Sequence, residues 1–259
     1  MLLVIDVGNT NVVVGVFEGE NLRATWRIGT DVHRMADEYA VILMNLFPHR
    51  GLSMSSVDQA ILASVVPPLT STFEEVCKRY FDTVPLVVGT GIRTGVRILF
   101  DNPREVGADR IVNAAAAYRL YGGPCVVIDF GTATTFDAVS KDGDYIGGAI
   151  APGIGIASEA LFQRAARLWR VELTRPAFAI GKNTVAGMQS GIIFGYVGLV
   201  EGLVARFKRE MGGTARVIAT GGLAEMIAEE TQVIEVVDQD LTLIGLKMIY
   251  EMNERPRGR

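Results

Sequence analysis

The segment VIDVGNTN near the start of the sequence joins an apolar run to a carboxylate and several polar side chains. Asp6 ends the run, and Gly8, Asn9, Thr10 and Asn11 follow it. Glycine lets a ligand approach the backbone closely, and successive backbone N–H groups can hold phosphate oxygens. Asp6 could also hold a hydrated Mg²⁺, an ion that needs few protein ligands. The same residues would equally suit an ordinary β-hairpin with a polar turn.

The segment VIDFGTAT repeats this arrangement in the middle of the chain, with Asp129, Gly131, Thr132 and Thr134 after an equally apolar run. At an offset of 123 residues the Val, Ile, Asp and Gly of the two segments coincide, which indicates an internal duplication. Two such loops facing each other across a cleft would form a phosphate clamp. A third turn, Thr220-Gly221-Gly222, could carry adenosine or its phosphates near a helix N-terminus.

The segment NPREVGADR places Asp109 at the start of an alanine-rich helix expected over 111–120. The positive end of a helix dipole favours a carboxylate there, so helix capping alone would explain it. The functional alternative is phosphoryl transfer, which needs positioning, a metal and one group that accepts a proton. Arg104 and Arg110 could neutralise phosphate or bind a substrate carboxylate in a bidentate manner.

Other chemistries are disfavoured by the residue types present. Two cysteines, Cys77 and Cys125, cannot build a disulfide framework, and each lies in an apolar run. The two histidines, His33 and His49, lie among polar or turn residues and fit no known metal-ligand spacing with the cysteines. Thiol, zinc and Ser-His-Asp chemistry are therefore not expected.

The elements that position these segments follow the order βββαβαβα, written twice. In the first half we expect strands at 2–7, 11–18, 22–29, 60–66 and 85–89, with helices near 39–47 and 73–81. In the second half we expect strands at 125–130, 134–139, 144–150, 216–219 and 233–236, with helices near 155–168, 185–210, 223–230 and 242–252. This order predicts two α/β domains, 1–122 and 123–259, with mixed sheets and a ligand cleft between them.

Composition narrows the class of protein further. The 259 residues are 49% apolar and 21% charged, which excludes a disordered chain. A net charge of −4 argues against nucleic-acid binding. The opening MLLVID reaches a carboxylate at once, so no signal peptide is expected. Polar residues interrupt the uncharged stretch 183–200, which favours a buried or interface helix over a membrane span. We therefore expect a soluble, cytoplasmic protein.

Six motifs taken together resemble the type III pantothenate kinases of the acetate/sugar kinase–hsc70–actin superfamily. The motifs are DVGNT, GADR, DFGTATTFD, GGAIAPG, GKNT and TGG, and they follow the family order over nearly the whole chain. The resemblance implies duplicated ribonuclease-H-like/actin-like domains. It also implies transfer of the ATP γ-phosphoryl group to the primary hydroxyl of pantothenate, giving 4′-phosphopantothenate in the first step of coenzyme A biosynthesis.

The resemblance further implies a role for individual residues. Asp109 would be the proton acceptor, Asp129 would ligate K⁺ or NH₄⁺, and Asp6 would hold Mg²⁺ through water. ATP would contact Asp6, Val7, Gly8, Asn9, Thr10, Asn11, Val12, Val13 and Thr132. Pantothenate would contact Phe100, Gly107, Ala108, Asp109, Arg110 and Thr184. The family works as a homodimer, with the stretch 185–200 as our candidate for the interface.

One departure and two alternatives accompany this interpretation. Phe100 occupies a position where family members often carry Tyr, so one hydrogen bond of about 1 kcal/mol would be missing. A kinase or phosphohydrolase of the same superfamily with another acceptor would share the fold. A nucleotide-binding transcription accessory factor would share it too, although the acidic balance weighs against direct DNA contact.

Overall fold

A computed structural model describes residues 1–165 and 168–254, and the chain in it forms two compact units. Unit 1 contains residues 1–116 and 240–254, and unit 2 contains residues 117–239. The division falls inside helix α3 (Ala108–Tyr121) and places the C-terminal helix α7 (Leu241–Asn253) in unit 1. The expected boundary between residues 122 and 123 stays a prediction about the two duplicated halves of the sequence. The compact units are divided at residues 116 and 240 instead.

Unit 1 is built on a mixed sheet with strand order β3-β2-β1-β4-β5. Strands β1, β2 and β3 are antiparallel neighbours, and β1, β4 and β5 run parallel. Its strands are β1 (Leu2–Val7), β2 (Asn11–Glu18), β3 (Asn21–Gly29), β4 (Gln59–Ser64) and β5 (Leu86–Val87). The two-residue strand β6 (Arg97–Ile98) also belongs to unit 1 but is not part of this five-stranded sheet. Its other helices are α1 (Ala36–Leu46), α2 (Pro67–Tyr80) and the short 3₁₀ turns η1 (Pro48–Arg50), η2 (Met54–Ser56) and η3 (Pro103–Glu105).

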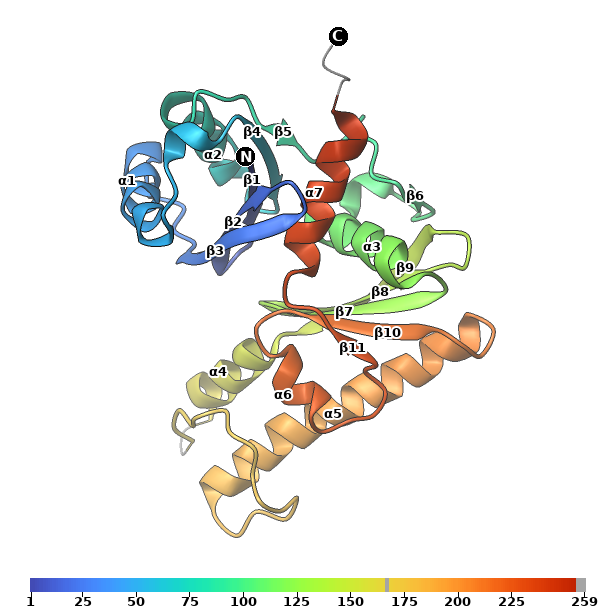
Figure 1. Ribbon diagram of the computed structural model, residues 1–259. Coiled ribbons are helices and arrows are strands. Elements are labelled where there is room, and N and C mark those ends of the chain that lie inside the picture. Colours follow the sequence, from blue (N-terminus) through green and yellow to red (C-terminus); the bar gives the residue numbers. More distant parts are fainter. Residues whose placement is uncertain (166–167, 255–259) are drawn as a thin grey trace. The chain divides into compact units, whose positions relative to one another are not determined.

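Helices cover both faces of this sheet, which explains why β1 is an unbroken apolar run. Leu3, Ile5 and Val7 point to one face and join the core under α1 and α2. Leu2 and Val4 point to the other face and join the core under α7. Figure 1 shows α1 and α2 on one side of the strands and α7 on the other. Strand β1 is thus buried on both faces.

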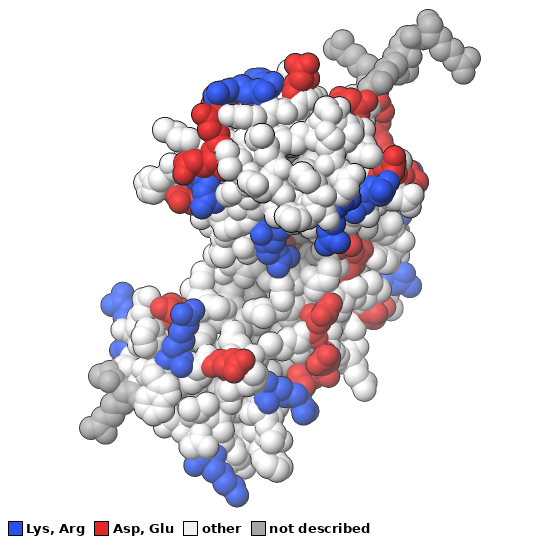
Figure 2. Space-filling view, turned by 60° about the vertical axis from the view of Figure 1, so that its left-hand side comes forward, with Lys and Arg blue, Asp and Glu red and all other residues white. Residues whose placement is uncertain are grey.

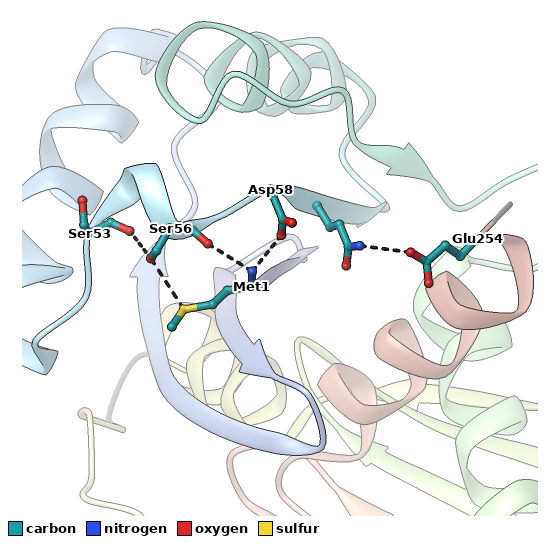
Figure 3. Close-up of polar contacts among 6 residues, drawn as sticks. Met1, Ser53, Ser56, Asp58 and Glu254 are labelled. Atoms are coloured by element: carbon teal, nitrogen blue, oxygen red, sulfur yellow. Dashed lines mark hydrogen bonds and ion pairs between the residues drawn. The ribbon is translucent and has the colours of Figure 1, made fainter. Parts of the chain in front are cut away.

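The first residue of the chain is anchored to unit 1 by polar contacts (Figure 3). The Met1 ammonium donates to Ser56 O at 3.0 Å and to Asp58 Oδ1 at 2.7 Å. Gln59 Nε2 donates to Glu254 Oε1 at 3.0 Å, which ties the start of β4 to the residue after α7. Both ends of the described chain are therefore held beside β4.

Unit 2 repeats the plan of unit 1. Within a six-stranded sheet, the five strands that unit 2 itself contributes lie in the order β11-β10-β7-β8-β9, which matches β5-β4-β1-β2-β3 of unit 1, and the expected duplication is confirmed. The strands are β7 (Cys125–Phe130), β8 (Ala133–Val139), β9 (Asp144–Pro152), β10 (Arg216–Thr220) and β11 (Val236–Val237). The helices are α4 (Ile154–Arg164), α5 (Thr184–Glu210) and α6 (Ala224–Ala228). Helices α4, α5 and α6 supply one hydrophobic core against this sheet.

Helix α5 has 27 residues and is apolar enough to cross a membrane by length and composition. Of its most apolar window, 44% is buried inside the protein. A core helix of a globular protein passes the same test, so this helix is weak evidence for a membrane span. Its buried side chains, among them Ile192, Val200 and Val204, belong to the core of unit 2.

Candidate functional site

The Asp6 segment of unit 1 is a tight turn at the carboxyl end of β1. Gly8 N–H donates to Asn11 O at 3.0 Å, and Thr30 Oγ1 donates to Gly8 O at 2.7 Å. A Cβ on Gly8 would lie 3.0 Å from Asn11 O, so a glycine suits this position. Asp6 is half-buried, while Asn9 and Thr10 are exposed at the tip. The predicted hairpin is present, and it presents polar groups at a strand end.

Asp109 lies on the first turn of α3, folded back over Gly107. A Cβ on Gly107 would lie 2.5 Å from Asp109 Oδ1 and 3.4 Å from Val65 Cγ1. Val65 directly follows β4, and its N–H donates to Val7 O at the end of β1 at 3.0 Å. The structure therefore brings the GADR segment and the Asp6 turn to the same edge of the sheet in unit 1, where β1 and β4 end.

Burial and a neighbouring cation act in opposite directions on the Asp109 carboxyl. Burial raises the pKa of the Asp109 carboxyl, opposed by the hydrogen bond from Arg110 N–H and by the charge of Arg110. That N–H donates to Asp109 Oδ1 at 2.7 Å. A carboxylate whose pKa moves toward neutrality becomes a better proton acceptor near physiological pH. Arg110 itself is 9% exposed, which places a cation beside it in the first turn of α3.

The remaining unit 1 residues flank this edge in sequence. Ala108 begins α3 and is half-buried next to Asp109. Phe100 is half-buried and precedes η3, whose first turn is capped by Asn102 Oδ1 accepting from Arg104 N–H at 3.3 Å. Arg104 is exposed on this short turn. Val12 and Val13 begin β2 and pair with Val7 and Asp6 across the hairpin.

The equivalent turn in unit 2 joins β7 to β8. Gly131 N–H donates to Ala133 O at 3.1 Å, and Gly153 N–H donates to Thr132 O at 3.1 Å. A Cβ on Gly153 would collide with the Thr132 carbonyl, so Gly153 allows the end of β9 to approach the turn. Thr132 is exposed at the tip, as Asn9 and Thr10 are in unit 1.

Asp129 is half-buried near the end of β7, between two threonines in register. Thr220 of β10 lies opposite it on one side and Thr135 of β8 on the other. A Cβ on Gly221 would lie 2.6 Å from Asp129 Oδ1, and Gly221 has φ +93°. The Thr220-Gly221 turn is thus packed directly against the Asp129 carboxylate, which places the third polar motif beside the second.

Thr184 lies elsewhere in unit 2, on the first turn of α5. Asn183 caps this helix, since its Oδ1 accepts from Ala186 N–H at 2.9 Å. Thr184 is exposed at a groove of about 650 Å³ between α4 and α5, whose lining is mainly apolar. The lining residues are Ala157, Leu161, Leu168, Thr184, Gly187, Met188, Gly191, Ile192 and Tyr196. Asp129 and Thr132 are not among them.

Sequence reasoning missed two residues that contact the unit 1 segments and one buried carboxylate in β8. Thr30 acts through one bond to a backbone carbonyl, and Val65 acts through an apolar contact, so neither residue type signals its role. Asp137 lies inside the motif DFGTATTFD but was given no role, although it is fully buried. A charged residue in a strand that is otherwise buried was the available signal.

The carboxylates fit ions that need few protein ligands. Among residues 1–165 and 168–254, no three His, Cys, Asp or Glu side chains come together as a metal cluster. Mg²⁺ usually keeps several waters and is bound by one or two carboxylates and the substrate phosphates, so the single carboxylate of Asp6 would be sufficient. The Asp129 carboxylate between two hydroxyl side chains is an oxygen donor set, of the kind that coordinates K⁺.

Solved structures with low sequence identity share this fold. A Campylobacter jejuni protein described as a Baf family transcriptional activator aligns with a TM-score of 0.63 and 19% identity, over 97% of this chain and 98% of that one. An inorganic polyphosphate/ATP-glucomannokinase from an Arthrobacter species aligns with a TM-score of 0.52 and 12% identity, over 98% and 99%. These likenesses confirm the duplicated actin-like architecture.

Sequence comparison identifies the family. The family model for type III pantothenate kinase matches residues 2–206. A protein from Moorella thermoacetica, named type III pantothenate kinase, is 57% identical over 253 residues, which is 98% of this chain and 100% of that one. The residues matched by the family model include Asp6, Asp109, Asp129 and Thr184. The chain therefore belongs to the type III pantothenate kinase family.

Proposed function

We propose that this chain transfers the γ-phosphoryl group of ATP to the primary hydroxyl of pantothenate, the first step of coenzyme A biosynthesis. Family membership supports the reaction class and its acceptor. The observation that carries the proposal is the position of Asp109. Its carboxylate, with a pKa raised by burial, lies at the strand edge that also holds the Asp6 turn.

Unit 1 supplies the acceptor side of the reaction in this proposal. The pantothenate hydroxyl oxygen forms a bond to Pγ, the bond from Pγ to the β,γ-bridging oxygen breaks, and the hydroxyl proton passes to the Asp109 carboxylate. Phe100, Gly107, Ala108 and Arg110 bind pantothenate. The buried Arg110 cation suits a carboxylate such as that of pantothenate.

Two polar turns supply groups for the nucleotide in this proposal. The turn from Asp6 to Val13 and the residue Thr132 would bind ATP phosphates through backbone N–H and hydroxyl groups. Asp6 would hold Mg²⁺ through water when the ion is bound with ATP, and the ion would supply positive charge that favours phosphoryl transfer. Asp129 would hold K⁺ or NH₄⁺. Thr184, on the first turn of α5, would close over pantothenate.

A coupled assay of ADP release tests the reaction. Purified chain is mixed with ATP, Mg²⁺ and pantothenate, with and without K⁺, beside the variants Asp109→Asn and Asp142→Asn. Asp142 is exposed in the turn after β8 and serves as a matched control for the loss of one carboxylate. We expect turnover that requires pantothenate, rises with K⁺, and falls about 10²- to 10⁴-fold in Asp109→Asn alone.

Other outcomes would redirect the proposal. ADP release with a different acceptor but not with pantothenate would keep the fold and reject the substrate. Full activity in Asp109→Asn would leave this carboxylate as a helix cap. ATP binding without any turnover would favour a nucleotide-binding accessory role.

We also propose that the chain forms a homodimer through α5. Gly187, Gly191, Gly195, Gly198 and Gly202 follow one another at spacings of three or four residues, so they share one helix face. A Cβ added at any of the first four would meet nothing within 4 Å. Exposed glycine inside a helix costs about 1 kcal/mol relative to alanine, and a bare face permits close approach of another backbone. Nearby Ile156, Leu161 and Phe162 of α4 are exposed as well.

Light scattering coupled to gel filtration tests this assembly. The wild type should have the mass of a dimer, and Gly195→Leu should shift it toward the monomer. Ser71→Leu, which adds similar bulk to an exposed position of α2 in unit 1, should leave the mass unchanged. A monomeric wild type would contradict the dimer.

We propose cytoplasmic action without nucleic acid or membrane. On the face in Figure 2, basic and acidic side chains of the described residues are interspersed and form no single basic stripe. Both cysteines are free and buried, as suits a reducing compartment. Cell fractionation, with detection of the chain in the soluble cytoplasmic fraction, tests this placement.

A further inference from the structure

The sheet of unit 2 carries a row of polar side chains that the proposed reaction leaves unused. Thr135 lies opposite Asp129 in the β7–β8 register, and Asp137 lies opposite Val127, two residues along the same strand. Opposite residues of antiparallel strands project to the same face, with Cβ atoms about 4.5 to 5.5 Å apart. Thr135 is therefore the neighbour of Asp129 on this face, and Asp137 is the next residue of β8 on the same face.

Asp137 is bound by two hydroxyl groups. Its side chain is fully buried, Oδ1 accepts from Tyr145 OH at 2.8 Å, and Oδ2 accepts from Thr135 Oγ1 at 3.1 Å. A buried carboxylate requires such donors, because a buried charge without hydrogen bonds is costly. An ionised carboxylate can only accept hydrogen bonds, so the hydroxyl proton of Thr135 is directed at Asp137.

This hydrogen bond fixes what Thr135 can offer to Asp129. A hydroxyl has one proton and two lone pairs, and the proton of Thr135 is already in use. On the side of Asp129, Thr135 Oγ1 therefore offers only its lone pairs. The Asp129 carboxylate offers oxygen lone pairs to the same space. Two oxygens of this kind on one face are suited to a cation between them.

We propose that Thr135 Oγ1 is a second protein ligand of the monovalent cation assigned to Asp129, and that Asp137 is the positioning residue that aims it. The inference rests on the proposed function, which assigns that cation to Asp129. Tyr145 completes the arrangement by holding the other oxygen of Asp137. Asp137 of β8 and Tyr145 of β9 are both buried, and together they fix the orientation of Thr135 Oγ1 beside Asp129.

The chain offers a matched control one residue away. Thr134 is the adjacent residue of β8, and its side chain points to the opposite face, where it is fully buried. The expected place of Thr134 in a phosphate-holding loop is therefore not supported by its burial. Its Oγ1 has no hydrogen-bond partner among the described residues. Thr134→Val and Thr135→Val thus make the same chemical change on the same strand, and only the second removes an oxygen next to Asp129.

The experiment measures cation binding directly and during turnover. Thermal unfolding is followed over a series of KCl concentrations at constant ionic strength in choline chloride, and ADP release from ATP and pantothenate is followed over the same series. Thr135→Val should raise the half-saturating K⁺ concentration roughly 10- to 100-fold in both series. Thr135→Ser, which keeps the hydroxyl, should stay near wild type, and Thr134→Val should match wild type. At saturating K⁺, kcat of Thr135→Val should recover toward the wild-type value.

Two results would overturn the inference. One is a wild-type K⁺ midpoint in Thr135→Val, and the other is a wild type that K⁺ does not stabilise. If Thr135→Val is too unstable to purify, Thr135→Ala is measured against Thr134→Ala with the same expectations. Failure of the proposed function is distinguishable, because it would appear as a wild type without pantothenate-dependent ADP release whatever the K⁺ series shows.

Discussion

Replacing Gly221 with alanine tests whether the turn after β10 sets the position of Asp129. Gly221 has φ +93°, a backbone conformation that residues with a side chain rarely adopt. An added Cβ would lie 2.6 Å from Asp129 Oδ1, 2.7 Å from Phe130 N and 2.8 Å from Phe130 C. Gly212 offers a matched control, because its φ is +91° and an added Cβ would meet nothing within 4 Å.

The expected magnitudes follow from these two geometries. The positive φ costs alanine about 1–2 kcal/mol at either position. At Gly221 the added carbon must also gain roughly 0.7–0.9 Å to reach an ordinary contact near 3.5 Å. Two of its three neighbours are backbone atoms of β7, which cannot rotate away. Overpacking of this kind costs about 1–3 kcal/mol more, so Gly221→Ala should lose about 2–5 kcal/mol in total.

Thermal unfolding of the two variants under identical conditions measures the difference. An additional 1–3 kcal/mol corresponds to a melting temperature roughly 2–12 °C lower for Gly221→Ala than for Gly212→Ala. Gly221→Ala should also need more K⁺ for half-maximal ADP release, because the displaced atom is the Asp129 carboxylate oxygen. Equal melting temperatures for the two variants, with unchanged K⁺ response, would refute the reasoning.

Three further predictions follow from burial and packing. Burial raises the pKa of Asp109, so its ionised form destabilises the fold as the pH rises through that pKa. Asp109→Asn should therefore melt at a higher temperature than wild type at pH 8, and this advantage should shrink as the pH falls. Gly245→Ala should lower the urea midpoint although alanine favours helix by about 1 kcal/mol, since its Cβ would lie 2.7 Å from Val112 O and Val112 Cγ1. Burial raises the pKa of Cys77 and Cys125 to about 12, so a chromogenic disulfide reagent at pH 8 should detect both thiols only after unfolding.

Much of the strand framework could be predicted from the sequence because its strands are buried on both faces. The expected ranges 2–7 and 125–130 coincide with β1 and β7. Each apolar run is followed by a carboxylate and a glycine, which are Asp6 and Gly8 in the first repeat and Asp129 and Gly131 in the second. The same repeat placed Asp6 and Asp129 at equivalent strand ends. Residue type and periodicity were therefore sufficient to predict the order of the strands and the positions of Asp6 and Asp129.

The start of helix α2 and the short strands β11 and β6 could not be predicted from the pattern of apolar residues. The expected strand 60–66 ended at Pro67-Pro68, but these prolines form the first turn of α2, where a missing N–H costs nothing. Strand β11 lies at Val236–Val237, beyond most of the expected range 233–236, because only a short segment pairs with β10. The two-residue strand β6 was not expected, since so short a strand has no period to read.

The contacts that shape the site were the least predictable. The bond from Thr30 to Gly8 O and the packing of Val65 against Gly107 depend on tertiary proximity between distant segments. The apolar face of 242–252 indicates only that this helix is buried somewhere. It does not indicate that α7 packs on the sheet of the opposite repeat. The sequence shows the type of each residue, but it does not show which distant segments come into contact in the folded chain.

The membership of α7 in unit 1 has a consequence for synthesis on the ribosome. Leu246 and Ile249 pack with Leu2, Val4 and Ile61 in one core, yet they follow the strands of the first sheet by more than 100 residues in the sequence. At about 5–20 residues per second, the face of the first sheet waits roughly 6–25 s after residue 116 for its cover. During that interval the nascent chain exposes an apolar strand surface of the kind that chaperones bind. A stop codon shortly before α7 would therefore destabilise unit 1, because one face of its sheet would stay uncovered.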